Sequence, residues 1–315
     1  MRVHLFGIGV VFLIFLRPML SQSPPPRDIA DPGIEPSLAA SSPIETINVH
    51  VHEVNLVLSV TDHRGKFVNS LQPSDLTILD NGVEQTKLTF FERETDLPIK
   101  IALVLDISAS VTYLFDTEKS AIRSFLRAVA RPTDSVMLFA FNENIQLTSP
   151  VTNNWNETAK RVKRLKPYGE TALYDAASEA SHWLALDQGP ARRILILVSD
   201  GEDNRSKTTM DMTISDALKA NAAIYSVNVN RERVSDEAKQ GAAVLKYLAE
   251  ATGGAYLDDP GHDVAESFVK IRRELRSQYA LAYKLSNPGV RTFHHLQVLV
   301  AHRMRVHCRS GYYVK

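Results

Sequence analysis

The stretch IALVLDISAS, residues 101–110, changes abruptly from apolar to polar. Its first five residues are apolar without alternation, which is typical of a parallel strand covered on both faces. Asp106 then follows, with Ser108 and Ser110 at alternate positions beyond it. Asp and Ser after a strand commonly cap the next helix, and they are also ligands for a cation. The stretch therefore predicts a core strand ending either in a helix cap or in a polar site.

Similar apolar runs recur along the middle of the chain and alternate with helical patterns. In the first of these patterns Ile122, Phe125, Leu126 and Val129 lie at helical spacing. Strand–helix alternation of this kind predicts an α/β fold with a doubly wound, mostly parallel sheet flanked by helices. The further strands are expected at VMLFAF (136–141), ILILV (194–198) and AIYSV (223–227).

Both flanks of this middle region are rich in strand signals. The first flank carries Asn81-Gly82 between two β-prone runs, which is typical of a tight hairpin. The second begins with QYALAYKL at residue 278. Neither flank holds enough strands to fold alone, so we expect the two to build one small β-sandwich-like domain together.

The chain begins with Arg2 and an apolar run from Leu5 to Leu16, the pattern of an export signal. The run is shorter than the roughly 20 residues that span a bilayer. We expect an exported protein, periplasmic or extracellular, with membrane contact only if this segment is retained as an anchor. The expected parts are a signal peptide or anchor (1–23), a Pro-rich disordered linker (24–43), a β-rich flank (44–97), an α/β domain (98–277) and a second β-rich flank (278–315).

Composition excludes several classes of function. Lysine plus arginine equals aspartate plus glutamate, 36 against 36, and gives no argument for binding nucleic acid. The single cysteine, Cys308, excludes an internal disulfide and a Cys-rich zinc site. His294 and His295 lack metal-ligand partners at a matching spacing and are interpreted as surface strand residues. No nucleophile elbow, zinc-protease motif, phosphate loop or dinucleotide fingerprint occurs, so we expect no enzyme and no small-molecule substrate.

Three short motifs bring oxygen donors to one edge of the expected sheet. Ligands of such sheets bind at the carboxyl ends of the strands. Asp200 follows the strand at 194–198 in SDGED, and Thr171 lies in a GET turn before a helix. With no histidine or thiol among the donors, the set favours Mg²⁺, or Mn²⁺ or Ca²⁺, over zinc or copper. The expected metal ligands are Asp106, Ser108, Ser110, Thr171 and Asp200.

Asp-x-Ser-x-Ser, Gly-x-Thr and Ser-Asp-Gly in this order resemble the metal-ion-dependent adhesion site of von Willebrand factor type A domains. The flanks, with SVTDHRG at residue 59 and QYALAYKL, resemble the bacterial VWFA-related domain family. Ala109 departs from the glycine that is frequent there, and Glu170 occupies a variable slot. The resemblance implies direct coordination by the three hydroxyls and ligation by the two aspartates, commonly through water.

We therefore predict an exported adhesion or interaction module whose cation captures a carboxylate of a partner protein. Glu170, Glu202 and Asp203 are the residues expected to contribute to ligand binding. One alternative is a structural envelope component that a cation merely stabilises. Another is a metal-dependent hydrolase, which would take its general base from the same three acids.

Overall fold

The computed structural model describes residues 53–93, 97–186, 189, 191–230, 234–258, 264–285, 293–300 and 304–313. The expected signal segment and Pro-rich linker lie outside these ranges. Within the described ranges no helix has the length and hydrophobicity of a membrane-spanning segment.

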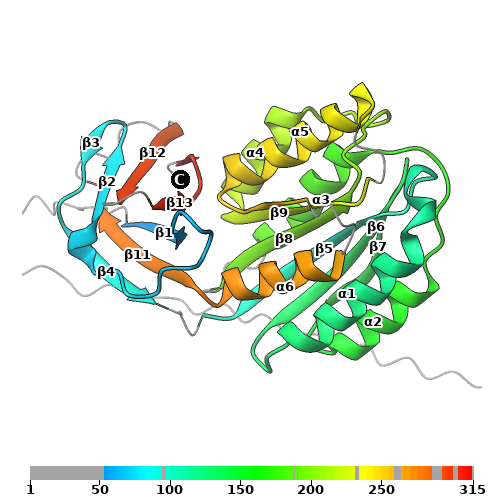
Figure 1. Ribbon diagram of the computed structural model, residues 1–315, viewed down its shortest axis with the longest axis horizontal. Coiled ribbons are helices and arrows are strands. Elements are labelled where there is room, and N and C mark those ends of the chain that lie inside the picture. Colours follow the sequence, from blue (N-terminus) through cyan, green and yellow to red (C-terminus); the bar gives the residue numbers. More distant parts are fainter. Residues whose placement is uncertain are drawn as a thin grey trace, which may run out of the picture. The chain divides into compact units, whose positions relative to one another are not determined.

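A six-stranded sheet with the order β10-β9-β8-β5-β6-β7 forms the α/β part of the chain (Figure 1). The strands from β10 to β6 are parallel to their neighbours, and only β7 runs antiparallel, at the edge. The predicted mostly parallel sheet is confirmed. The strands are β5 (Ile99–Asp106), β6 (Ser135–Phe141), β7 (Ile145–Thr152), β8 (Arg192–Ser199), β9 (Ala222–Asn228) and β10 (Tyr256–Leu257).

Helices cover both faces of this sheet, which explains the unbroken apolar runs of its strands. In β5, Ile101 and Leu103 join the core beneath α1, α2 and α6, whereas Ala102 and Val104 join the core beneath α3, α4 and α5. Each strand thus needs apolar side chains in both directions. The helices are α1 (Phe115–Val129), α2 (Trp155–Arg164), α3 (Leu173–Leu186), α4 (Met210–Lys219), α5 (Asp236–Thr252) and α6 (Val264–Leu275), with a 3₁₀ turn, η2 (Ser110–Tyr113), before α1.

The two flanks form two four-stranded sheets that share one core. One sheet has the order β13-β1-β11-β4 and the other β14-β12-β2-β3. Leu56 and Leu58 of β1, Tyr283 of β11 and Val298 of β12 belong to a single buried cluster between them. The strands are β1 (Glu53–Thr61), β2 (Leu76–Asp80), β3 (Val83–Glu84), β4 (Leu88–Arg93), β11 (Gln278–Lys284), β12 (Phe293–Val300), β13 (Arg305–His307) and β14 (Gly311–Tyr313), and a 3₁₀ turn, η1 (Pro73–Asp75), precedes β2.

Strands from opposite ends of the sequence pair directly in this sandwich. Residues Glu53 to Ser59 of β1 lie antiparallel to Lys284 to Gln278 of β11. Between β2 and β3 the expected hairpin turn is present, with positive φ values of 48° at Asn81 and 78° at Gly82. Both residues adopt the left-handed conformation that this tight turn requires.

One expectation about the sandwich is wrong. His294 is not a surface residue, because only 6% of it is exposed. Its Nδ1 lies 2.6 Å from Oδ1 of Asp80, and the hydroxyls of Tyr283 and Tyr312 donate to Oδ2 of the same carboxylate at 2.7 and 2.6 Å. Asp80 is thus the centre of a buried polar network that ties β2, β11, β12 and β14 together.

Candidate functional site

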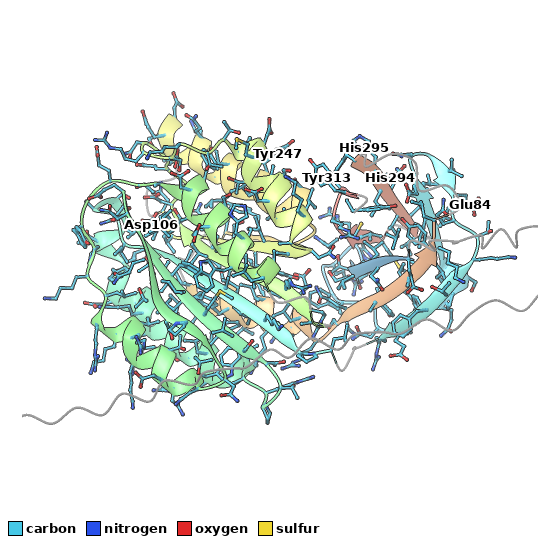
Figure 2. All side chains as sticks on the ribbon, turned by 180° about the vertical axis from the view of Figure 1, so that it is seen from behind. Glu84, Asp106, Tyr247, His294, His295 and Tyr313 are labelled. Carbon is cyan, nitrogen blue, oxygen red and sulfur yellow. The ribbon has the colours of Figure 1, made fainter. Side chains whose placement is uncertain are left out.

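The two aspartates of the predicted site lie side by side because their strands do. Asp106 is the last residue of β5 (Figure 2), and Asp200 directly follows β8, the parallel neighbour of β5. The hydroxyl of Ser199 donates a hydrogen bond of 2.6 Å to Oδ2 of Asp106. Asp106 and Asp200 are both almost fully buried, with 2% and 4% of their surface exposed. The sheet therefore places two carboxylates at one edge with little access to bulk water.

The chain after β5 folds back over the Asp106 carboxylate. The backbone N–H of Ser108 donates to Oδ1 of Asp106 at 2.8 Å, and the hydroxyl oxygens of Ser108 and Ser110 lie 3.0 Å apart. Ser108 is buried, whereas Ser110, the first residue of η2, is exposed. The two serines thus extend from the buried carboxylate to the surface.

Neither Asp106 nor Ser108 caps a helix, which removes the capping interpretation of this motif. Helix α1 begins at Phe115, and its N-cap residue, Leu114, makes no side-chain cap. The η2 turn has Ala109 at its N-cap, again without a side-chain hydrogen bond. The polar residues after β5 therefore serve the local turn and one another.

Thr171 is held between the two aspartate loops by backbone hydrogen bonds. On one side the N–H of Ala109 donates to the carbonyl of Gly169 at 3.0 Å. On the other side the carbonyl of Thr171 accepts from the N–H groups of Asn204 and Arg205, both at 3.0 Å. All five predicted ligand residues consequently lie at the end of β5 or on loops that meet at the carboxyl edge of the sheet.

The backbone at Gly169 favours glycine. Its φ is 84°, in the left-handed region that side chains disfavour. A Cβ atom at this position would lie 2.0 Å from Oε2 of Glu143. That Glu143 oxygen also accepts the backbone N–H of Glu170 at 2.9 Å, so the contact cannot relax without losing a hydrogen bond of the loop.

The site gathers buried acidic groups whose ionisation is opposed by burial and by one another's charges. Burial, followed by the charge of Asp200, raises the pKa of Asp106 to about 7, although hydrogen bonds from Ser108 and Ser199 act in the opposite direction. Burial and the charges of both aspartates raise the pKa of Glu118, on α1, to about 8. Oε1 of Glu118 is buried and has no hydrogen-bond partner. A cation is the ordinary means of stabilising such a group of carboxylates.

Glu118 is a site residue that sequence reasoning missed. It is 2% exposed and lies on the buried face of α1, three residues after Phe115 and four before Ile122. An acidic residue on an apolar helical stripe is costly to bury, and this position was the signal that could have identified it.

The three acids expected to contact a ligand have different surroundings. The carboxylate of Glu170 pairs with Arg205 at the surface. Oδ1 of Asp203 accepts the backbone N–H of Leu173 at 2.7 Å and the hydroxyl of Ser206 at 2.6 Å. Glu202 is half-buried, and burial, together with the charges of Asp200 and Glu237, raises its pKa. Of the three, Glu202 is the nearest to Asp200 in the sequence, and the charge of Asp200 contributes to its raised pKa.

A cavity of about 250 Å³ adjoins the site. Ser110 and Asp200 line it together with Glu202, and the exposed ring of Tyr113 stands at its wall. The cavity gives a group from outside access to one hydroxyl and one carboxylate of the site.

The donor set fits a hard cation that keeps part of its water shell. Among the described residues no three His, Cys, Asp or Glu side chains form a cluster able to hold a metal. Two carboxylates plus hydroxyls are too few for a complete cage of protein ligands, which disfavours calcium and zinc centres. Magnesium commonly binds one or two carboxylates and retains several waters. Glu118, whose Oε1 has no hydrogen-bond partner, is a further buried acid nearby.

Comparisons with known proteins give one family match and solved structures of limited similarity. Residues 101–202 match the family model of the von Willebrand factor type A domain. None of the curated proteins matches the chain. Among solved structures, the von Willebrand factor type A protein of Catenulispora acidiphila is 14% identical with a TM-score of 0.47, and the match covers 78% of this chain and 74% of that one.

Two further solved structures are similar to a little over half of the chain. The conserved hypothetical protein BatB of Bacteroides thetaiotaomicron is 16% identical with a TM-score of 0.45, and the match covers 56% of this chain and 98% of that one. The vWF domain of the type V pili tip protein Mfa5 of Porphyromonas gingivalis is 12% identical with a TM-score of 0.46, covering 57% and 95%. From the match over residues 101–202, together with the sheet and helices described above, the chain contains a domain of the von Willebrand factor type A kind.

Proposed function

We propose that the chain is an exported protein-binding module in which Mg²⁺ captures an acidic group of a partner protein. The ligands would be Asp106, Ser108, Ser110, Thr171 and Asp200, which lie on loops that meet at one edge of the sheet. The observation that carries the proposal is the group of buried acids there: the pKa values of Asp106 and Glu118 are raised, and Oε1 of Glu118 has no hydrogen-bond partner.

The position of the donors supports binding of an external group. The two aspartates are buried, whereas Ser110 is exposed and lines the adjoining cavity. A cation bound among hydroxyls and few carboxylates keeps net positive charge, and it would supply a coordination position for a carboxylate from outside. Ser110 and the cavity would set the direction from which that carboxylate arrives.

A hydrolase is the less well supported alternative. It needs a general base within hydrogen-bond reach of the substrate. The carboxylate of Glu170 already pairs with Arg205, and Asp203 accepts two hydrogen bonds. Glu202, with its raised pKa, is the acid at the cavity that retains this capacity. Turnover of phosphoester, ester or peptide substrates with Mg²⁺ or Mn²⁺ that disappears in Glu202→Gln would favour this alternative.

The primary test measures cation binding and carboxylate binding separately on the full chain. Isothermal titration calorimetry with Mg²⁺, Mn²⁺ and Ca²⁺ would be run on wild type, Ser110→Ala and Asp200→Asn. Ser120→Ala is the matched control, because Ser120 is an exposed serine on α1 away from the loops. We expect wild type and the control to bind Mg²⁺ equally and the two site variants at least tenfold more weakly. Absence of cation binding to wild type would refute the proposal.

A second titration distinguishes a binding module from a component that a cation only stabilises. A peptide carrying a glutamate, and its glutamine counterpart, would be titrated into the Mg²⁺-loaded and EDTA-treated protein. A binding module retains the glutamate peptide only with the cation present, and does not retain the glutamine peptide. A raised melting temperature with Mg²⁺ but equal binding of both peptides would instead favour the structural component.

The predicted signal segment supports export. Residues 1–23 lie outside the described ranges, so the argument rests on their sequence, a short positive region followed by an apolar run. Cell fractionation and N-terminal sequencing of the mature protein would show whether the chain leaves the cytoplasm and whether this segment is cleaved or retained.

A further inference from the structure

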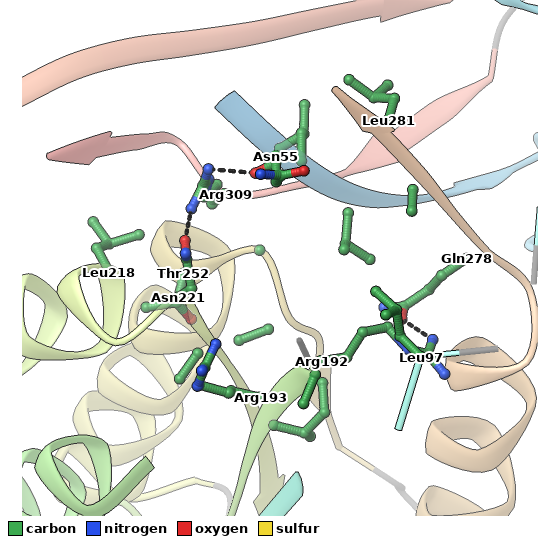
Figure 3. A pocket seen from close by; sticks show the side chains of 18 of the residues that line it. Asn55, Leu97, Arg192, Arg193, Leu218, Asn221, Thr252, Gln278, Leu281 and Arg309 are labelled. Carbon is green, nitrogen blue, oxygen red and sulfur yellow. Dashed lines mark hydrogen bonds between the residues drawn. The ribbon is translucent and has the colours of Figure 1, made fainter. Parts of the chain in front are cut away.

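A second cavity, of about 330 Å³, is shown in Figure 3. It lies at the opposite end of the sheet strands from the aspartate site. It is lined by Arg192 at the beginning of β8, whereas Asp200 follows the end of the same strand. At about 3.3 Å per residue the strand separates the two places by more than 20 Å. The cavity is therefore independent of the proposed cation site, and the inference does not rest on that proposal.

Three arginines, Arg192, Arg193 and Arg309, line this cavity, and none of the described lining residues is acidic. Figure 3 shows their guanidinium groups on different sides of the space, with Arg309 bonded to Asn221 and Arg192 to Gln278. Strong positive charge without a lining carboxylate is uncommon in a partly buried position.

The acceptors that the structure provides for Arg192 and Arg309 are neutral. Arg192 donates from Nη1 to the carbonyl of Leu275 and to Oε1 of Gln278, both at 2.8 Å. Arg309 donates from Nη2 to the carbonyl of Asn55 at 2.7 Å and also contacts the Asn221 side chain. In both arginines Nε is buried without a partner.

The pKa values of these two arginines shift in the direction expected for buried charges that lack a close opposite charge. It lowers the pKa of Arg192 to about 10 and also lowers the pKa of Arg309. The charges of Tyr225 and Asp134 raise the pKa of Arg192, but neither residue lines the cavity. An anion within the cavity would therefore form charge-assisted hydrogen bonds with Arg192 and Arg309, for which the described residues supply only neutral acceptors.

Beside the polar side chains of Asn55, Asn221, Thr252 and Gln278, the lining is apolar. Leu56 of β1, Leu281 of β11 and Leu218 of α4 are buried around it. Phe90 and Leu97 are large hydrophobic residues with 41% and 37% of their surface exposed. Exposed apolar side chains beside a cavity commonly mark a ligand site.

We propose that this cavity binds a small monoanionic amphiphile, a carboxylate carried on an alkyl or aryl body. At about 30 Å³ for each water-sized group, the volume holds roughly eleven non-hydrogen atoms. An eight-carbon fatty acid or a phenyl-substituted propanoic acid has this size. The carboxylate would lie against the arginines and the body against the leucines and Phe90.

The first experiment tests whether both the head and the body of such a ligand are recognised. Octanoate, 3-phenylpropanoate, 1-octanol and acetate would each be titrated into the full chain by calorimetry, in EDTA so that the aspartate site holds no cation. We expect saturable 1:1 binding of at least one of the two larger carboxylates, with 1-octanol and acetate at least tenfold weaker. The two carboxylates distinguish an alkyl from an aryl source. Absence of binding for both, or equal binding of 1-octanol, overturns the proposal.

The second experiment locates the site. Ala191→Phe fills the cavity from a half-buried position without removing charge, and Arg309→Gln removes one cation. Ala130→Phe and Arg127→Gln are the matched controls, at exposed positions outside the cavity. We expect each test variant to weaken carboxylate binding at least tenfold and the controls to leave it unchanged. Circular dichroism would verify folding. If Arg309→Gln unfolds, Ala191→Phe alone decides, and unchanged binding in that variant overturns the assignment.

Discussion

The hydroxyl of Ser199 donates a 2.6 Å hydrogen bond to Oδ2 of Asp106, so the last residue of β8 holds the carboxylate at the end of β5. The backbone N–H of Ser108 engages the other carboxylate oxygen at 2.8 Å. With both oxygens engaged, the orientation of Asp106 is set before any cation arrives. This preorganisation is what a metal ligand requires of its surroundings.

Ser199→Ala should therefore weaken Mg²⁺ binding without removing a proposed ligand. Loss of a hydrogen bond that orients a metal ligand typically costs about 10- to 100-fold in metal affinity. Calorimetric titration of Mg²⁺ would measure the change, with Ser120→Ala as the exposed control. Equal affinity in Ser199→Ala and wild type would show that Asp106 needs no such support.

Glu118→Gln should reduce the pH dependence of stability in the absence of cations. The pKa of Glu118 is raised from 4.5 to about 8, so between these values the folded protein binds a proton that the unfolded chain has released. Stability from this group is complete below about pH 4.5 and is lost as pH rises toward 8. Urea unfolding in EDTA at several pH values would measure it. The slope should fall but not vanish, since the raised pKa of Asp106 acts in the same direction. Identical slopes would contradict the assignment.

Gly169→Ala should destabilise the Thr171 loop. The φ of 84° costs a side chain about 1 kcal/mol, and the contact with Glu143 adds to it. The free energy of unfolding and the Mg²⁺ affinity should both fall. Gly65→Ala is the matched control, because Gly65 has a φ of 76° but no atom within 4 Å of the added Cβ. Its effect isolates the backbone conformation from the contact, and an equal loss in both variants would show that the contact is unimportant.

Asp80→Ala should lower the free energy of unfolding of the sandwich more than substitution of an exposed residue does. It leaves the two tyrosine hydroxyls and His294 without their shared acceptor. Removing one member of a buried, hydrogen-bonded charged network costs about 3 kcal/mol or more. Urea denaturation would measure the loss against Asp75→Ala, whose carboxylate accepts an exposed backbone N–H. A loss no larger than that of the control would mean that the network contributes little.

Cys308 should react slowly with iodoacetamide in the folded protein. Burial raises the pKa of its thiol to about 11, which leaves very little thiolate at neutral pH. Mass spectrometry should show slow alkylation in native buffer and rapid alkylation in urea. Rapid labelling of the native protein would indicate that the segment around Cys308 opens readily.

The α/β part was predictable because its strands are covered on both faces. IALVL and ILILV have apolar residues in both directions, and these became β5 and β8. The edge strand β7 was missed, since its IQLTSPVT sequence is half-exposed and contains Pro150. Such a strand has a weak apolar signal and pairs on one side only.

Two buried polar residues carried signals that were not used. His294 shares its strand face with Leu296 and Val298, at intervals of two residues, and this spacing indicates an inward direction. Glu118 occupies the apolar stripe of α1 in the same way. The meeting of loops at the aspartate site followed from strand order alone, but the partners of Asp203 and Glu170 depend on loop conformations that short-range patterns do not encode.

The pairing of β1 with β11 has a consequence for biosynthesis. The hydrogen bond between Ser59 and Glu274 spans 215 residues. The two strands that pair with β1, namely β11 and β13, lie still later in the chain. During translation β1 emerges long before β11 and β13, whereas paired residues of the six-stranded sheet are at most 93 positions apart, as Ile99 and Arg192 are. The apolar strand β1 therefore stays unpaired during most of synthesis. Pairing between strands so far apart in the sequence is slow. A chaperone that shields residues 53–61 until synthesis ends would shorten the time for which that strand can aggregate.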